Sequence, residues 1–537
     1  MPKPRNLIFL FLLIVAGCLF LSSHLVYQQD LAQGDHGRDL YSFEAVFQGQ
    51  IPYRDFWWVY GPIMPYYYGI FYKILGTSVA SVLVGQTLLT LCSGILIYLS
   101  LALFIAPLAA FIAALWFWAY FPDFYFTYNH TGGITLLLAA VYTLLLYIKK
   151  PRPAYLYWGL VFVFLLSFVK INFGFTAWLS YLLSVRWIDK TNRIPTSPEK
   201  EKFYAIGLKI LPLLILAVYA FLVAGLPFHE IRQCFPYWPS DHPYHTPFEK
   251  WLKEWPKTII ESIQSGWPHQ FLAMLVISSV ISLFYFSKKN KIPPLERSHF
   301  LLAVKILTLF YLFQLNEYMN GATTNYRLYW AKPFSLLLCF LAVGSALRHY
   351  WSLLCWLTLA VLFYALFLNF KGQADKLASP GFYSNYWTHP RGRVVLISNK
   401  GQWRDTVNQT SDYLEAHLKA EETFFALPYD PLYYYLLGKK SPTRQLIFFE
   451  HINIPAQQEK HVIADLERNH VNYIVLSNRM KSKEEATGTL GETYCPILGK
   501  YMNDNFTIVA TYGEWDKEPL WAWNHGTKIL KRVKELP

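Results

Sequence analysis

The chain has 537 residues, of which 54% are hydrophobic, 18% are aromatic and only 15% are charged. Soluble domains carry about 25% charged residues, so this composition excludes an ordinary soluble protein and indicates a helical membrane protein. The formal net charge of +13 does not indicate nucleic-acid binding, because the Lys and Arg residues cluster between apolar runs, as the orientation bias of membrane proteins requires.

Eleven apolar runs are each close to the ~20 residues that cross the hydrocarbon core of a bilayer. Unpaired backbone groups cannot face lipid, so we expect these runs to be helices. The first run resembles a signal peptide, but its apolar part is too long and no good cleavage site closes it, so we interpret it as an uncleaved span. The predicted spans are residues 6–26, 78–100, 102–121, 131–148, 154–169, 171–187, 207–225, 269–286, 299–315, 331–347 and 352–370.

Basic segments set the predicted orientation. With the N-terminus in the cytoplasm, alternation of the spans places four basic segments on the cytoplasmic side, as the positive-inside rule requires. These segments are residues 149–152, 186–209 and 287–297, and Arg348. The other loops and the C-terminal tail then face outward, namely residues 27–60, 122–130, 170–172, 226–268, 316–330 and everything after 371.

The composition becomes polar after about residue 371. Short apolar runs there are typical of buried strands and alternate with helix-like stretches, which predicts a mixed α/β domain. At roughly 165 residues this domain is long enough to bury a core of its own. We therefore expect a polytopic α-helical domain over residues 1–370 and an extracytoplasmic α/β domain over 371–537. The expected strands are 393–398, 422–427 and 472–476, and the expected helices are 404–420 and 456–469.

The first outer loop, residues 27–77, is the most informative segment. Asp35 lies between two glycines a few residues beyond the first span, and residues 37–48 predict a short amphipathic helix. A carboxylate at the membrane surface is costly unless it is paired or functional; the alternative is that Asp35 caps this helix. Residues 61–75 predict a further helix that lies at the interface. The apolar face of the first helix would hold Leu40, Phe43, Ala45 and Phe47.

The motifs of this loop resemble a known family. Asp35-x-Gly37 is followed by Gly49-x-x-Pro-Tyr-Arg-Asp-Phe56 and by Tyr60-Gly-Pro62. This pattern resembles the bacterial relatives of the protein O-mannosyltransferases and aminoarabinose transferases, which belong to the GT-C superfamily of membrane glycosyltransferases. The tail is also similar to the outer domain of such proteins. The resemblance implies a GT-C fold of about eleven spans in a bacterial inner membrane, with the N-terminus cytoplasmic.

The resemblance also implies a reaction. The donor would be a polyprenyl-phosphate sugar, and the acceptor a hydroxyl of a lipid, a glycan or a protein, in contact with membrane lipids. The family uses an acidic residue of the first outer loop, and Asp35 matches its position as a base, provided that partial burial raises its pKa. His36 follows Asp35 where the family often has a second acidic residue, which leaves a second carboxylate or a divalent metal open. No cofactor and no metal ligand are predicted.

The leaving phosphate needs cations aimed at its developing charge, and three outward-facing residues are candidates. Lys170 stands at the corner between two spans, where relatives often carry Lys-x-Asn-x-Gly; its alternative role is to extend its amino group to the interface. Arg327 suits bidentate phosphate contact, with an interfacial anchor as the alternative. Arg232, beside His229 and Glu230, is the third candidate.

Six more residues are predicted to line the substrate site. Asn129 and His130 open the fourth span, where helix capping is the alternative role. Tyr60 belongs to a group of aromatic residues that suit either sugar rings or the interface. Asp55 is predicted to orient the loop, and the histidines of 238–245 are predicted to lie at a surface. The six lining residues are His36, Arg38, Tyr60, Asn129, His130 and Asn172.

Other functions stay open at this stage. A transporter or flippase of lipid-linked sugar predicts ionisable groups deep in the spans and internal repeats, neither of which stands out. A polymerase or ligase of surface polysaccharide shares the donor chemistry, and a structural assembly partner is a further alternative. A disulfide between Cys234 and Cys495, the two cysteines in polar segments, also stays open.

Overall fold

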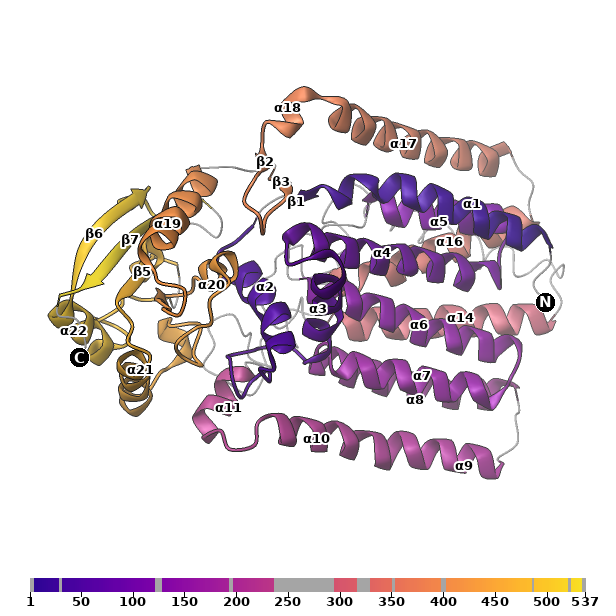
Figure 1. Cartoon of the computed structure of the whole chain (residues 1–537). Coiled ribbons are helices and arrows are strands. Elements are labelled where there is room, and N and C mark those ends of the chain that lie inside the picture. The colour runs from indigo at the N-terminus through magenta and orange to yellow at the C-terminus, as the bar shows by residue number, and fades with distance from the viewer. Residues whose placement is uncertain are drawn as a thin grey trace.

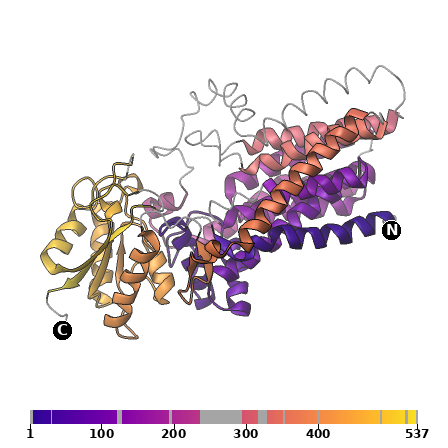
Figure 2. The same ribbon diagram turned by 90° about the horizontal axis from the view of Figure 1, so that it is seen from above.

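The computed structural model describes residues 4–28, 31–120, 128–192, 197–235, 294–315, 329–349, 353–396, 402–484, 487–519 and 523–533. Long helices form a bundle that carries an α/β domain at one end (Figure 1). The short helices α2 (Asp35–Ala45) and α3 (Ile63–Leu75) lie between the bundle and this domain, and the N-terminus lies at the far end of the bundle (Figure 1). The view turned by 90° shows the same arrangement (Figure 2).

A helix occupies each predicted span except 269–286, which lies outside the described residues. By length and composition, four helical stretches of the described part are suited to cross a membrane, namely Ile8–Leu25, Val79–Ala102, Asn129–Lys149 and Pro198–Leu222. The chain is thus a multi-pass helical membrane protein, and eleven spans remains a prediction. The helices of the bundle are α1 (Pro4–Leu21), α4 (Val79–Ala102), α5 (Pro107–Tyr120), α6 (Asn129–Lys149), α7 (Pro153–Ser167), α8 (Ile171–Asn192), α9 (Pro198–Ala205), which a π-helical turn joins to α10 (Leu211–Leu222), α14 (Pro294–Gln314), α16 (Lys332–His349) and α17 (Leu353–Ala378).

Small residues allow the bundle to pack closely. A Cβ at Gly94 of α4 would lie 2.3 Å from atoms of the Trp118 ring on α5, so only glycine admits that ring. The Trp118 indole N–H then donates to the carbonyl of Thr90 at 3.0 Å. Close approach at a small residue, together with an interhelical hydrogen bond, is the usual means of joining helices where the hydrophobic effect is absent.

The first loop, residues 27–77, folds largely as predicted. Residues 37–48 are helical, in α2 and the 3-10 turn Val46–Gln48, and α3 confirms the helix at 61–75. Leu40, Phe43 and Ala45 are buried, as expected of an apolar face, whereas Phe47 is exposed. Phe47 lies beside Gly69 of α3, where a Cβ would be 2.3 Å from its ring, and its apolar surroundings remain a prediction.

The C-terminal α/β domain holds a four-stranded sheet of order β4-β5-β7-β6, in which β4 and β5 are parallel and the other pairs antiparallel. The expected strands at 422–427 and 472–476 and the expected helices at 404–420 and 456–469 are confirmed. The strands are β4 (Phe425–Leu427), β5 (Tyr473–Ser477), β6 (Phe506–Gly513) and β7 (Gly526–Arg532), and the helices are α19 (Trp403–His417), α20 (Leu432–Leu437), α21 (Ala456–Arg468) and α22 (Pro496–Asn505).

A second, smaller sheet ties the N-terminal segment to the chain that follows α17. Strand β3 (Val394–Leu396) pairs in parallel with β1 (Tyr27–Gln28) and antiparallel with β2 (Tyr386–Trp387). The strand expected at 393–398 therefore exists, but it pairs with residues just after the first helix and is not part of the four-stranded sheet.

Two further elements lie at the same end of the chain's bundle. The short helix α11 (Phe228–Cys234) follows α10, and α18 (Pro380–Tyr383) follows α17.

Cys234 of α11 and Cys495 are both buried and unbridged among the described cysteines. The disulfide that the sequence left open is therefore not formed; the Cys234 thiol instead accepts a hydrogen bond from Arg444 at 3.2 Å.

Candidate active site

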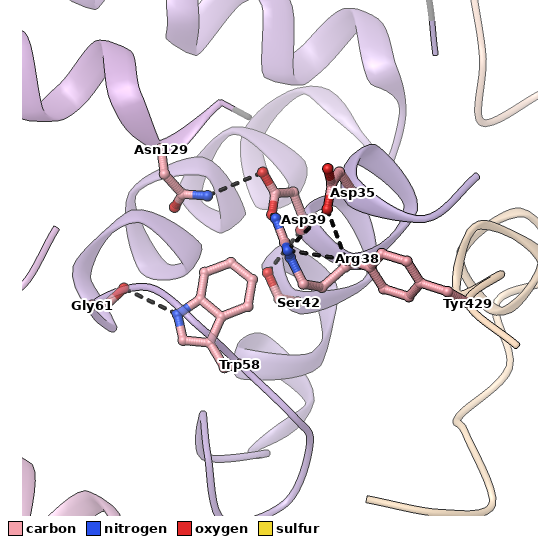
Figure 3. Close-up of polar contacts among 8 residues, drawn as sticks. All are labelled: Asp35, Arg38, Asp39, Ser42, Trp58, Gly61, Asn129 and Tyr429. Atoms are coloured by element: carbon pink, nitrogen blue, oxygen red, sulfur yellow. Dashed lines mark hydrogen bonds and ion pairs between the residues drawn. The ribbon is translucent and has the colours of Figure 1, made fainter. Parts of the chain in front are cut away.

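Asp35 is the first residue of α2 and does not cap it. The N-cap residue is Gly34, and no side chain bonds to the backbone there. Instead, Oδ1 of Asp35 accepts a hydrogen bond from Nη1 of Arg38 at 3.2 Å and another from the hydroxyl of Tyr429 at 2.9 Å (Figure 3). The capping alternative was wrong, because the helix turns Asp35 toward these two partners.

Arg38 holds two carboxylates at once. Its Nη1 contacts Asp35 and also donates to the Tyr429 hydroxyl at 2.9 Å, while Nε and Nη2 donate to Oδ1 of Asp39 at 3.0 and 2.8 Å (Figure 3). Asp39 is fully buried, one helical turn beyond Asp35. The forked guanidinium suits this task, since its donors lie in fixed directions. Asp39 was not singled out from the sequence, although its spacing of four from Asp35 places both on one helix face.

Asn129 joins the same network. Its side-chain amide donates to Oδ2 of Asp39 at 3.0 Å (Figure 3). The N-cap of α6 is Tyr128, again without a capping side chain, so the capping role that we considered for Asn129 was wrong. The Asn129 side chain points to Asp39 and not to the backbone at the helix start, and it supplies the buried carboxylate with a buried donor.

Burial and neighbouring charges act on the two carboxylates in opposite directions. Burial alone would raise the pKa of Asp35, but the Arg38 guanidinium and the Tyr429 hydrogen bond outweigh it and hold the pKa below its ordinary value. For Asp39, burial prevails over Arg38 and raises the pKa to about 6. The upward shift of the pKa that the sequence analysis required of Asp35 therefore does not occur, because Arg38 and Tyr429 stabilise the charged carboxylate.

Tyr60 brings several predicted residues together. Its ring lies 4.9 Å from the guanidinium carbon of Arg38 and 5.5 Å from Nζ of Lys170, and its centroid is 5.8 Å from that of the His130 ring. Lys170 is only 2% exposed and also lies 5.4 Å from the Phe173 ring. Its amino group is thus inside the protein, beside the rings of Tyr60 and Phe173, and does not extend to the surface.

A glycine explains why the Tyr-Gly-Pro motif fits this place. The backbone N–H of Gly61 donates to the carbonyl of Val169 at 2.9 Å, and that of Ile63 donates to the carbonyl of Phe168 at 3.0 Å. A Cβ at Gly61 would lie 2.0 Å from the Phe168 oxygen, so no larger residue fits. The motif therefore docks the first loop onto the α7–α8 corner and sets Tyr60 beside Lys170.

The two glycines that flank Asp35 serve the C-terminal domain. A Cβ at Gly34 would lie 2.5 Å from the Tyr429 ring, and one at Gly37 would lie 2.3 Å from the backbone nitrogen of Leu432. The Leu432 N–H donates to the carbonyl of Gln33 at 3.2 Å. The close approach needs both glycines. Tyr429 was missed from the sequence, and the paired glycines were the signal that another segment packs there.

The other predicted residues have varied places. His36 is buried, and its Nδ1 accepts from the Ala32 N–H at 2.9 Å, which supports the start of α2. Asn172 lies in the first turn of α8, two residues from Lys170. Arg232 is exposed on α11. Arg327 and the 238–245 cluster lie outside the described residues.

Asp55 has a local structural role, as predicted, and no metal site accompanies it. Its carboxylate accepts from the backbone of Ile51 at 2.7 Å and pairs with Arg54 at 3.0 Å. Across the described ranges, no three His, Cys, Asp or Glu side chains converge as metal ligands. The structure therefore assigns no ligands to the divalent metal that the sequence leaves open.

The fold is that of known membrane glycosyltransferases. ArnT from Cupriavidus metallidurans, solved bound to undecaprenyl phosphate, aligns over 100% of both chains with a TM-score of 0.53 and 11% identity. The apo oligosaccharyltransferase of Archaeoglobus fulgidus aligns over 95% of this chain and 74% of its own with a TM-score of 0.50 and 12% identity. No family model and no curated protein matches the sequence. The chain therefore shares the fold of these two enzymes, which agrees with the fold that the sequence resemblance implied.

Proposed function

We propose that this protein is a membrane glycosyltransferase that moves a hexosyl or pentosyl group from a polyprenyl-phosphate donor to an acceptor hydroxyl, with inversion at the anomeric carbon. One observation carries the proposal. The carboxylate of Asp35 and the amino group of Lys170 are joined through Arg38 and Tyr60 in one cluster at the end of the bundle. A base and a buried cation that belong to one cluster are what such a transfer needs.

The fold supports the choice of donor. ArnT, which shares the fold, binds undecaprenyl phosphate, and a lipid of that kind offers an anionic phosphate at the membrane surface. Lys170 is our candidate to hold the phosphate, since its ammonium group is a positive charge held inside the protein beside Tyr60, and a cation stabilises the charge that develops on a leaving phosphate. Arg327 and Arg232 remain further candidates for the same role.

The transfer proceeds in one displacement. An acceptor hydroxyl oxygen attacks the anomeric carbon, and the bond between that carbon and the phosphate oxygen breaks, so the phosphate leaves with the electron pair. Asp35 takes the hydroxyl proton on Oδ2, because both of its hydrogen bonds from the described residues end on Oδ1. The attacking oxygen becomes strongly acidic as its new bond forms, so a carboxylate with a low pKa can still accept the proton. Lys170 stabilises the charge that develops on the phosphate.

The basic segments between the helices support a position of this site on the outer side of a bacterial inner membrane. Helix α6 begins at Asn129, beside the site, and ends at Lys149, next to the basic segment Lys149–Arg152. A basic segment at the opposite end of the helix favours a cytoplasmic position for that end. The site and the C-terminal domain would then face outward, where polyprenyl-linked sugars meet acceptors of the cell envelope.

The proposal is tested by transfer in proteoliposomes. A panel of radiolabelled undecaprenyl-phosphate sugars is offered with an extract of envelope acceptors to the wild type, Asp35→Asn and Asp55→Asn. Asp55 is the matched control, a carboxylate of the same loop bound to an adjacent arginine. We expect Asp35→Asn to lose transfer by about 10²- to 10⁴-fold and Asp55→Asn to retain it. Equal activity of Asp35→Asn and the wild type contradicts the assignment of Asp35. Movement of labelled lipid across the bilayer without transfer contradicts the enzyme and favours a flippase.

A further inference from the structure

We propose that Tyr429 of the C-terminal domain is a positioning residue for the catalytic carboxylate: with Arg38 it holds Oδ1 of Asp35 and so presents Oδ2 to the acceptor. The inference rests on the proposed function, since it assigns Asp35 as the base. It makes the C-terminal domain part of the active site, and the site incomplete without it.

Three polar groups form a closed triangle. The Tyr429 hydroxyl donates to Oδ1 of Asp35 at 2.9 Å and accepts from Nη1 of Arg38 at 2.9 Å, and the same Nη1 lies 3.2 Å from Oδ1 (Figure 3). Each group restrains the other two. Within the described ranges both contacts end on one oxygen, so they fix the rotation of the carboxylate. The Asp35 side chain remains 35% exposed, which leaves it within reach of a substrate.

The Tyr429 ring is itself held on several sides. It packs edge-on against Trp57 of the first loop, with centroids 6.2 Å apart, and against Phe449 of its own domain at 6.1 Å. Its third contact is Gly34, where a side chain would collide with the ring. Tyr429 is 5% exposed. A hydroxyl on so restrained a ring costs little further entropy when it orients Asp35.

The contact sets the direction of a pH effect. The groups that act on Asp35 are Arg38 and His36 from α2 and Tyr429 and Arg479 from the C-terminal domain, while Asp39 shares the Arg38 guanidinium. A hydrogen bond to a carboxylate favours its charged form. Removal of the Tyr429 hydroxyl therefore raises the pKa of Asp35. Because protonated Asp35 cannot act as a base, the acidic limb of the activity profile then moves to higher pH.

Tyr435→Phe is the matched control for Tyr429→Phe. Tyr435 lies on α20 at the same boundary, and its hydroxyl donates to the carbonyl of Arg391 at 2.9 Å, away from Asp35. Both variants lose one buried hydroxyl and keep the ring. A loss of domain docking alone would affect both, whereas a loss of carboxylate positioning affects only Tyr429→Phe.

The experiment is the pH dependence of sugar transfer between about pH 2.5 and 8, a range that reaches below the ordinary pKa of Asp35, with the pooled undecaprenyl-phosphate sugars as donor. We expect the acidic limb of Tyr429→Phe to move up by about one pH unit, with a lower kcat, a nearly unchanged KM for the donor and a wild-type unfolding temperature. Tyr435→Phe should keep the wild-type profile. A wild-type profile for Tyr429→Phe, or an equal shift in Tyr435→Phe, overturns the inference. The variant Asp35→Asn separates the two claims. If Asp35→Asn stays active, the assignment of Asp35 as the base fails. If Asp35→Asn is inactive but Tyr429→Phe keeps the wild-type pH profile, only the positioning role of Tyr429 fails.

Discussion

The hydroxyl of Tyr429 lies 2.9 Å from Oδ1 of Asp35, although 394 positions separate the two residues. This contact joins the first loop to the C-terminal domain at the carboxylate itself. Other contacts at the boundary maintain it: the Trp403 indole donates to the Gln33 side chain at 3.0 Å, and Arg391 pairs with Glu44 at 2.5 Å. The domain is therefore bound at this carboxylate, and its position bears directly on the pKa of Asp35.

Replacement of Arg38 by lysine tests the network at its centre. Arg38 donates to Asp35, Asp39 and Tyr429 through three nitrogens, and a single ammonium group does not reproduce that fork. We expect Arg38→Lys to lower the free energy of unfolding by about 3 kcal/mol, since loss of one partner of a buried pair costs about 3–5 kcal/mol, and to reduce transfer strongly. Arg54→Lys, which changes an exposed pair with Asp55, is the control and should behave as the wild type. Similar behaviour of the two variants would contradict a central role for Arg38.

Replacement of Gly37 by alanine tests the docking of the C-terminal domain. The added Cβ would lie 2.3 Å from the backbone nitrogen of Leu432, so α2 and α20 have to separate, and the Tyr429–Asp35 bond should lengthen or break. We expect faster hydrogen exchange in residues 429–437 and at least tenfold lower transfer, since about 1.4 kcal/mol in the barrier is tenfold in rate. The control is Gly372→Ala on α17, where nothing lies within 4 Å of the new Cβ. Unchanged exchange in Gly37→Ala would show that the contact is dispensable for docking.

Much of this site was predictable from the sequence, and the failures have physical causes. Asp35, Tyr60 and Lys170 were identified because they stand in short motifs. The structure sets Lys170 beside the Tyr60 ring and connects this ring to Asp35 through Arg38. Tyr429 was not, since a contact across 394 positions leaves no local pattern. Gly34 and Gly37 allow the C-terminal domain to approach Asp35, but a pair of glycines is equally typical of a turn and does not by itself predict such a contact.

Several strands were not predicted from the sequence. Strand β7 carries three basic residues in seven, so it does not show the apolar run that marked β4 and β5. Strand β6 does hold a short apolar run, Ile508–Ala510, which was not singled out. Strand β1 has only two residues, too short for any periodicity. The expected strand at 393–398 was found as β3, but its partners, β1 and β2, were not predicted. The partners of β3 depend on the path by which the chain returns past the first helix, and composition does not show that path.

A buried carboxylate in the C-terminal domain predicts a pH effect on stability. Asp430 is fully buried, and burial raises its pKa to about 7 even though Ser477 donates to its Oδ2 at 2.7 Å. The folded protein thus keeps this proton up to about pH 7, while the unfolded chain releases it near pH 4. Because the unfolded state binds fewer protons in that interval, Asp430 reduces stability as the pH rises from about 4 to 7.

The variant Asp430→Asn removes this titration. We expect its unfolding temperature, relative to that of the wild type, to increase between pH 5 and pH 8 in detergent. His525, whose pKa burial lowers to about 3, titrates in the opposite direction but is common to both proteins, so the difference isolates Asp430. A difference that is independent of pH would contradict the buried, protonated state of Asp430.

The most direct test of the account is whether Lys170 holds the phosphate of the lipid donor. The probe is undecaprenyl phosphate, titrated into the detergent-solubilised wild type, Lys170→Ala and Lys73→Ala, with affinity measured by a binding assay. Lys73 is the control, because it is an exposed lysine in the last turn of α3. A hydrogen bond to a charged group contributes about 1.5–3 kcal/mol, so we predict about a 10- to 100-fold weaker affinity for Lys170→Ala and wild-type affinity for Lys73→Ala. Wild-type affinity in Lys170→Ala, or no binding by the wild-type protein, would contradict the account.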